Sequence, residues 1–239
     1  EPEEGTLASL HEGEGHLPDI QTIMNNIRSM FEPLLPMKGK RVLVTAGPTR
    51  EAIDPVRFIS NRSSGRMGYA IAECARNMGA TVILISGPVF LQDIPEIKMV
   101  IVESAAEMLR AVLRNCIKAE YIFMAAAVAD YMPANTSAIK MKHSSDTLSL
   151  DLISAPDILK SIQDKTSAVI TAFALETHNG EKEAKRKMKQ KDVDFIVLNY
   201  ANEEGAGFYS STNHVTIYSK NGKSKELKKD RKDRVAKKI

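Results

Sequence analysis

Apolar, β-branched segments alternate with amphipathic helix patterns along most of the chain, and this alternation restricts the fold more than any other feature. Arg41 to Ala46 (RVLVTA) is a nearly unbroken apolar run that leads into a Gly-Pro turn, as a buried strand does. From Met67 to Met78, apolar residues recur at steps of three and four, and Gly79 stands where a helix C-cap favours positive φ. A strand followed by a helix that packs on it is the unit from which parallel sheets are built.

The same order continues toward the C-terminus. Ser104 and Glu107 form a capping box for a second helix, a short helix is expected from Pro156, and a Lys-rich helix at 181–190. Further buried strands are expected at Thr81–Ser86, 99–103, 121–127, 168–173 and 193–198, followed by a hairpin of 214–219 and 223–227. The sequence therefore predicts an α/β fold: a Rossmann-like, mostly parallel sheet with helices on both faces and a C-terminal β-hairpin.

Composition separates the first 38 residues from the rest. They carry seven acidic and two basic side chains, and only Ile20–Phe31 has a helical pattern. We interpret 1–38 as a linker or a remnant of a preceding domain, and 39–239 as the main domain. A chain of 239 residues that is 43% hydrophobic is long enough for one substantial core without disulfides or a structural metal.

Several classes of protein are disfavoured. No apolar run approaches the roughly 20 residues that span a bilayer, so we expect a cytoplasmic protein without a membrane partner. Cys74 and Cys116 are best explained as small hydrophobic residues of helices. Residues 220–239 carry ten basic and three acidic side chains but no aromatic residue, which favours a solvated helix over a nucleic-acid site.

The loops that follow Ala46, Ala127 and Phe173 hold the unusual residues, and loops at the carboxyl ends of parallel strands line one cleft. In the first loop, small residues stand at a helix start, where free N–H groups and the helix dipole favour an anion. These residues also suit a simple turn and cap, but Arg57 and Asn61 nearby favour a functional site. The loop matches neither GxGxxG nor GxxxxGK[ST], which excludes the two common nucleotide fingerprints.

Lysines mark two other segments. Lys140 and Lys142 end a Pro-containing loop that follows Asp130, and this loop suits either a mobile lid over phosphates or a solvated surface. Lys187 and Lys191 share one helix face, where they suit either a triphosphate or solvent. The residues alone leave both alternatives open.

Six segments occur together in one order: GPTREAIDPVRFISNRSSGRMG, AAAVADY, the lysine-bearing loop, SAPDIL, TAFALET and DFIVLN. In this combination the chain resembles the phosphopantothenate–cysteine ligase family, in the bacterial form fused behind a flavin-dependent decarboxylase. The resemblance implies a homodimeric, Mg²⁺-dependent enzyme of coenzyme A biosynthesis. With CTP it would activate the carboxylate of 4′-phosphopantothenate as an acyl-cytidylate, releasing pyrophosphate, and cysteine would then displace CMP.

The resemblance also implies roles for individual residues. Asn61 would hold the acyl-cytidylate for attack by cysteine, Arg57 would contact substrate charge, Lys140 would assist formation of the acyl-cytidylate, and Ala127 lies in a functional segment. The resemblance does not identify which residues would bind the metal. The nucleotide would lie against Gly47, Ser63, Ser64, Gly65, Met67, Gly68, Met124, Ala125, Ala126, Asp130, Pro156, Asp157, Ile158, Leu159, Phe173, Lys187 and Lys191.

The chain departs from the family pattern at several positions. Met141 and His143 replace residues of a Lys-Ile-Lys-Lys motif, which puts the last position of that motif in doubt. Residues 1–38 resemble the end of the fused decarboxylase, but Ser9 stands where that domain has a functional cysteine and His16 where it has arginine. FMN is therefore expected only in a decarboxylase domain that this chain lacks.

Two other functions stay open. A short-chain-dehydrogenase-like oxidoreductase that binds NAD(P) would share the fold class, but Tyr131 is followed four residues later by Asn135 rather than lysine. Residues 86–88 (SGP), after the second expected strand, also lack an acidic residue to hold a ribose. A non-catalytic module that binds nucleotides, or nucleic acid through 220–239, is the other alternative, although we expect no nucleic-acid partner.

Overall fold

The computed structural model describes residues 3–6, 12–31, 35–143, 147–203, 205, 207 and 210–239. The chain forms two compact units, Glu1–Leu35 and Pro36–Ile239. Ser9, the position of a cysteine in the family pattern, lies outside the described residues. In the described part of the chain, no helix has the length and apolar character needed to cross a bilayer.

The first unit contains an antiparallel hairpin of β1 (Glu3–Thr6) and β2 (Glu12–His16), followed by helix α1 (Ile20–Phe31). The carboxylate of Asp19 accepts a hydrogen bond from the amide of Thr22 at 3.0 Å and so caps the helix start. The predicted bounds of this helix are confirmed. The hairpin was not predicted, because its strands consist of Glu, Gly and other residues without apolar alternation.

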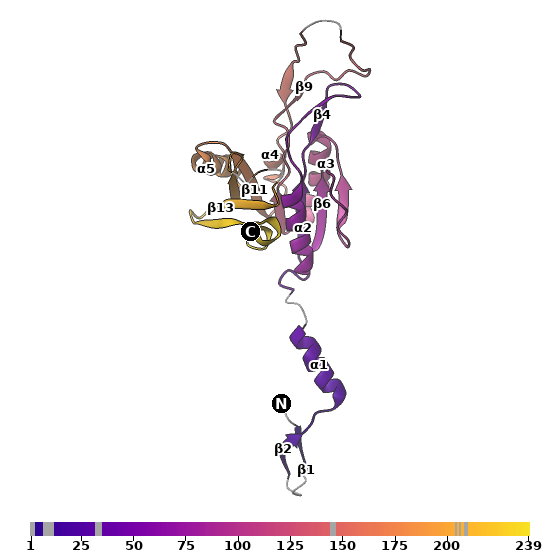
Figure 1. Cartoon of the computed structure of the whole chain (residues 1–239), viewed down its shortest axis with the longest axis vertical. Coiled ribbons are helices and arrows are strands. Elements are labelled where there is room, and N and C mark those ends of the chain that lie inside the picture. The colour runs from indigo at the N-terminus through magenta and orange to yellow at the C-terminus, as the bar shows by residue number, and fades with distance from the viewer. Residues whose placement is uncertain are drawn as a thin grey trace. The chain divides into compact units, whose positions relative to one another are not determined.

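An eight-stranded sheet forms the centre of the second unit (Figure 1). Its spatial order is β14-β13-β12-β11-β8-β3-β6-β7, in which β12 through β7 are parallel and β13 and β14 are antiparallel. The expected Rossmann-like sheet with a C-terminal hairpin is confirmed. The bounds are β3 Arg41–Ala46, β6 Thr81–Ser86, β7 Lys98–Ile101, β8 Tyr121–Met124, β11 Val169–Glu176, β12 Phe195–Tyr200, β13 Thr212–Ser219 and β14 Ser224–Arg231.

Helices cover both faces of this sheet. On one face, Val42 and Val44 of β3 pack with residues of two helices, α2 (Arg66–Asn77) and α6 (Lys232–Ala236). On the other face, Leu43 packs with residues of three helices. Because both faces are covered, β3 is buried on both sides, which explains its unbroken apolar sequence. The three helices are α3 Ala105–Asn115, α4 Ile158–Ile162 and α5 Gly180–Lys191, and a 3₁₀ turn, Cys116–Lys118, follows α3.

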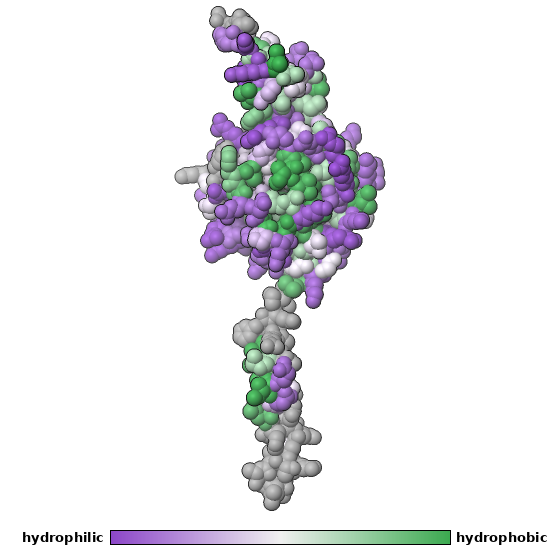
Figure 2. Space-filling view, turned by 90° about the vertical axis from the view of Figure 1, so that its right-hand side faces the viewer, coloured by the Kyte–Doolittle hydropathy of each residue, from purple (hydrophilic) through white to green (hydrophobic). Residues whose placement is uncertain are grey.

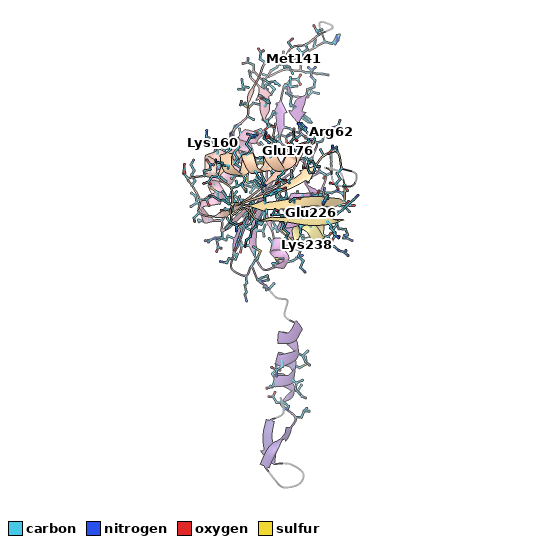
Figure 3. All side chains as sticks on the ribbon, turned by 90° about the vertical axis from the view of Figure 1, so that its left-hand side faces the viewer. Arg62, Met141, Lys160, Glu176, Glu226 and Lys238 are labelled. Carbon is cyan, nitrogen blue, oxygen red and sulfur yellow. The ribbon has the colours of Figure 1, made fainter. Side chains whose placement is uncertain are left out.

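Two hairpins form an arm at the carboxyl ends of the parallel strands (Figure 1). One joins β4 (Arg50–Ala52) to β5 (Phe58–Ser60), and the other joins β9 (Tyr131–Pro133) to β10 (Leu152–Ser154). Figure 3 shows Met141 on this arm, and Glu176 at the end of the unit from which the arm projects. Both segments were expected to be loops, because strands of three residues are too short to show a period.

The C-terminal segment also differs from expectation. The solvated helix predicted within 220–239 is wrong, because residues up to Arg231 belong to β14 and only Lys232–Ala236 are helical. Lys232, Val235 and Ala236 are buried.

Two strands of the central sheet are shorter than predicted. The strand expected at 121–127 ends at Met124, and the strand expected at 99–103 ends at Ile101.

Gly68 provides a test of the packing of α2 on the sheet. A Cβ atom at Gly68 would lie 2.5 Å from the Cβ of Ala46 and 2.9 Å from the carbonyl oxygen of Thr45. We predict that Gly68→Ala lowers the free energy of unfolding by about 1–3 kcal/mol, despite the better helix propensity of alanine. Urea unfolding measures this effect. The exposed Glu73→Ala serves as control on the same helix, and equal stability of the two variants would contradict the close approach.

Candidate functional site

The loops that follow β3 and β8 are joined by hydrogen bonds. The amide of Ala127 donates to the carbonyl oxygen of Gly47 at 2.8 Å, and the amide of Ala129 donates to Oγ1 of Thr49 at 3.0 Å. Thr45, at the end of β3, accepts from the amide of Ala126 at 3.2 Å. These bonds hold the two loops side by side at the point where the strand order reverses, the usual ligand position in such sheets.

Asn61 joins this arrangement from the loop before α2. Its side-chain Nδ2 donates to the carbonyl oxygen of Val128 at 2.9 Å and, less closely, to that of Ala127 at 3.4 Å. Oδ1 of Asn61 accepts no hydrogen bond from the described residues in this structure. Both Asn61 and Ala127 line one cleft, so the structure brings these two predicted catalytic residues together.

Helix α2 begins at the edge of the same cleft. Gly65 precedes it with a φ of 74°, a left-handed conformation that favours glycine. No side chain caps this helix, and its first turn contains no acidic residue. The amides of the first turn have no partner within the helix, so this end of α2 can receive an anion.

The cleft has a volume of about 710 Å³, large enough for a nucleotide. The loops after β3 and β8 line it, as expected from the sequence. At the third expected loop, the lining residues Phe173 and Leu175 belong instead to β11, which extends to Glu176. The predicted nucleotide-binding residues on its wall are Ser63, Ser64, Gly65, Met67, Met124, Ala125, Ala126, Asp130, Pro156, Asp157, Ile158, Leu159, Phe173, Lys187 and Lys191.

Helix α5 turns two lysines toward this cleft. The ammonium group of Lys187 donates to the carbonyl oxygen of Phe173 at 3.1 Å, and that of Lys191 pairs with Asp157. Burial lowers the pKa of Lys187, although the Asp130 carboxylate acts in the opposite direction. Burial alone would raise the pKa of Asp157, but the hydrogen bonds from the Lys191 side chain and the Lys160 amide, with the charges of both lysines, together lower it. The wall near α5 therefore presents cationic groups that are only partly neutralised.

Four predicted site residues do not line the cleft. Gly47 and Gly68 support its wall from behind: Gly47 with a φ of 75°, and Gly68 in contact with β3. Lys140 is exposed on the arm. Arg57 also lies on the arm, where Nε donates to the Asp54 carboxylate at 2.9 Å and Nη2 to the carbonyl oxygen of Met141 at 2.6 Å.

Asp54 connects the first arm hairpin with the lysine-bearing loop. Its carboxylate is buried and accepts from the amides of Val56 (2.8 Å), Arg57 (2.9 Å) and Met141 (3.1 Å), besides the Arg57 guanidinium. The hydrogen bonds from the Arg57 side chain contribute most to lowering the pKa of Asp54, which stays ionised. Asp54 therefore fixes the residue next to Lys140.

Several residues of the cleft were not predicted from the sequence. Asn199, at the carboxyl end of β12, and Asn213, on β13, line it, as do Arg66 and Lys232. Burial, and after it the charge of Arg66, lowers the pKa of Lys232 to about 8. One signal was available: Lys232 is three residues before Val235, so it shares a helix face with an apolar residue. Asn213 had no such signal.

Metal ligands are not gathered in the described part of the chain, where no cluster of three or more His, Cys, Asp or Glu side chains could hold an ion. Carboxylates do line the cleft, at Asp130 and Asp157. Mg²⁺ is commonly bound by one or two carboxylates together with substrate phosphates, so this donor set fits such an ion.

Comparisons with known proteins identify relatives. The family model described as "DNA/pantothenate metabolism flavoprotein C-terminal domain" matches residues 37–239. The coenzyme A biosynthesis bifunctional protein CoaBC of Bacillus subtilis (strain 168) is 44% identical over 232 residues, which cover 95% of this chain and 57% of that protein. A cysteine/cysteine sulfinic acid decarboxylase from an unknown prokaryotic organism is 40% identical over 243 residues, covering 99% of this chain and 68% of that protein.

A solved structure agrees with these matches. The crystal structure of the C-terminal domain of a coenzyme A biosynthesis bifunctional protein CoaBC superposes with a TM-score of 0.73 at 42% sequence identity. The superposition covers 85% of this chain and 93% of that one. The chain spans a little over half of the Bacillus relative's length, so the match concerns one part of a longer protein.

Asp54 offers a test of how the arm holds its lysine-bearing loop. In Asp54→Asn, one carboxylate oxygen becomes an NH2 group, which donates but does not accept, so the side chain loses the acceptor either for Arg57 and the Met141 amide or for the amides of Val56 and Arg57. We expect the amide of Met141 to exchange with deuterium about tenfold faster or more, because local opening costs less free energy. Hydrogen exchange followed by mass spectrometry or NMR measures the change. Asp151→Asn, an exposed position on the same arm, is the matched control; unchanged exchange in Asp54→Asn would show that the carboxylate does not hold the loop.

Proposed function

Because the chain belongs to the family of DNA/pantothenate metabolism flavoprotein C-terminal domains, we propose that it is a phosphopantothenate–cysteine ligase of coenzyme A biosynthesis. It joins 4′-phosphopantothenate to L-cysteine with CTP as the activating nucleotide. The observation that carries the proposal is one cleft that combines a helix N-terminus, two lysines of α5, and the Asn61 amide held against the loop after β8.

In the first half-reaction, a carboxylate oxygen of 4′-phosphopantothenate attacks the α-phosphorus of CTP. The bond to the bridging oxygen breaks, pyrophosphate leaves and an acyl-cytidylate remains. Negative charge increases on the leaving group, and the α2 N-terminus with Lys187 and Lys191 is placed to stabilise it. The family resemblance assigns a further cationic role in this step to Lys140, which lies on the arm outside this cleft. Mg²⁺ would enter with the nucleotide, with Asp130 as a nearby carboxylate, and would neutralise phosphate charge.

In the second half-reaction, the amine of cysteine attacks the acyl carbon and displaces CMP, which leaves an amide. Asn61 suits a positioning role because Nδ2 is already held by the Val128 carbonyl oxygen. Its Oδ1 is then oriented to accept a hydrogen bond from the amine or from the pantothenoyl chain. Holding the two reactants together converts this step into an intramolecular one.

The alternative functions have less support. Tyr131 does not form the Tyr-x-x-x-Lys pair of a short-chain dehydrogenase, since Asn135 follows at that spacing, and no tyrosine of the described residues lines the cleft. The basic C-terminal segment is folded onto the unit, with Lys232 and Val235 buried, rather than exposed along one face for nucleic acid. The 40% identical relative named as a decarboxylase extends beyond the part that this chain matches, so its name does not assign that reaction to residues 37–239.

We also propose that the chain forms a homodimer through its arm. Figure 2 shows hydrophobic side chains on the arm among hydrophilic ones. Large apolar side chains exposed there are typical of an interface. They are Val56, Phe58, Tyr131, Ile139, Leu148, Leu150, Leu152 and Ile153.

A pyrophosphate-release assay separates the two half-reactions. With phosphopantothenate and CTP alone, we expect a burst of pyrophosphate close to one equivalent per site, and continuous release only after cysteine is added. ATP replaces CTP in a parallel release assay. NADPH and CTP are compared for their stabilisation of the protein in a thermal-shift experiment. Stabilisation by NADPH without any CTP-dependent release would contradict the ligase assignment.

Two substitutions test which residue acts in which half-reaction. Asn61→Asp should keep the burst and lose cysteine-dependent turnover, because the acyl-cytidylate forms but is not held for attack. Lys140→Gln should slow the burst by about 10²-fold, the usual effect of losing one group that stabilises transition-state charge. Lys142→Gln, an exposed lysine on the same loop, is the control. A normal burst in Lys140→Gln would limit the loop to a structural role.

Ile153→Asp tests the dimer. A carboxylate in an apolar interface is unfavourable, so the dissociation constant of the dimer should rise about tenfold or more. Sedimentation equilibrium measures it. The same substitution at the exposed Ile117, which follows α3 away from the arm, should change nothing. A wild-type protein that stays monomeric at micromolar concentration would exclude this interface.

A further inference from the structure

The end of the cleft beside α6 contains a buried lysine with no assigned role. Lys232 is 7% exposed, and it lines the cleft together with Arg66, Met67 and Asn213. Its ammonium group donates to the carbonyl oxygen of Gly207 at 3.1 Å. It forms no ion pair within the described residues. A buried ammonium without a counter-ion is unfavourable unless another anion is supplied.

The acidic residues nearest in sequence do not supply that anion. Asp233 pairs with Arg231 at 3.0 Å, and Asp230 pairs with Arg234 at 3.5 Å and Lys238 at 3.4 Å. These carboxylates are therefore engaged by exposed cations at the surface. Lys232 is left facing the cleft.

A second cation lies close to this ammonium group. Arg66, the first residue of α2, is near enough that its charge contributes to lowering the pKa of Lys232. Like the lysine, Arg66 has no ion pair within the described part of the chain. The positive end of the α2 dipole lies at the same place. Three sources of positive potential thus converge on one end of a cavity that has room for a ligand.

We propose that Lys232 and Arg66 bind the terminal phosphates of the nucleoside triphosphate and retain them as the pyrophosphate leaving group. This inference rests on the proposed ligase function. Lys232 and Met67 line the same cleft, and Met67 and Phe173 pack in one cluster with Val235 of α6. Both Met67 and Phe173 are expected to contact the nucleotide, which favours its phosphates over the phosphate of phosphopantothenate.

The two cations complement the lysines of α5. Lys187 and Lys191 reach the cleft from the face of the sheet that α3, α4 and α5 cover, whereas Lys232 and Arg66 reach it from the face of α2 and α6. A polyphosphate between the two groups would be held from both sides. Burial of the Lys232 ammonium would strengthen its attraction to phosphate, since the effective dielectric constant is lower there.

Binding of three probes tests the proposal: inorganic pyrophosphate, CTP and CMP, each measured by calorimetry with Mg²⁺. In Lys232→Gln, we expect pyrophosphate and CTP to bind about tenfold to a hundredfold more weakly, the range of a charge-assisted hydrogen bond, and CMP to bind as in wild type. Lys232→Arg should recover part of the affinity. Lys237→Gln removes an exposed positive charge from the same segment and should bind all three probes normally.

The binding results separate the role of Lys232 from the choice of ligand. Equal weakening of CTP and CMP, or normal pyrophosphate binding, would overturn the role of Lys232. Weakening confined to phosphopantothenate, tested in a fourth titration, would overturn the choice of ligand. If Lys232→Gln does not fold, Arg66→Gln replaces it, because the exposed Arg66 side chain contributes no core packing. A wild-type protein that binds no CTP would instead refute the proposed function, so the two failures are distinguishable.

Discussion

The hydrogen bonds between the loops after β3 and β8 determine the geometry of everything that surrounds the cleft. Residues 45–49 and 126–129 use two threonine hydroxyls and several backbone groups to form a short pairing beyond the ends of the strands. Thr45 and Thr49 are fully buried, so water does not reach the backbone amides that they bind. Each hydroxyl therefore supplies the acceptor that its amide needs. Without this pairing, the Asn61 amide would lose the carbonyl oxygen that orients it.

Charge inside the cleft follows from burial as much as from composition. Lys187 and Lys232 are both lysines whose pKa is lowered by burial, and both donate to a backbone carbonyl oxygen rather than to a carboxylate. Such groups lose solvation in the free protein and recover favourable interactions when an anion binds. Burial of these ammonium groups therefore lowers the stability of the free protein and favours the binding of phosphate-bearing substrates.

The arm is organised by one buried carboxylate. Asp54 accepts hydrogen bonds from Val56 and Arg57, in the connection between β4 and β5, and from the amide of Met141, 87 residues away in the lysine-bearing loop. Arg57, which family resemblance associates with substrate, is engaged in this contact and does not line the cleft of its own chain. The exposed apolar side chains on the arm and the cleft of the same chain are thus separate surfaces of one unit, and a proposed homodimer would use the first of them.

The sequence by itself determined which segments form the central Rossmann-like sheet and the helices that cover it, because apolar periodicity and turn residues are local properties. Most of the cleft residues were indicated by the family resemblance. The motifs from Ser63 to Gly65 and at Met124 to Ala126 lie on one cleft because the parallel strands β3 and β8 end at one edge of the sheet, whereas Pro156 to Leu159 reach the cleft after the arm strand β10. The tertiary structure alone decided that the arm strands pair, that Lys232 is buried, and that Asn213 reaches the cleft. The burial of Lys232 and the position of Asn213 depend on contacts with distant segments of the chain, for which the spacing of Lys232 and Val235 was only a weak indication. The arm strands pair with segments close in sequence, but strands of three residues are too short to show a period.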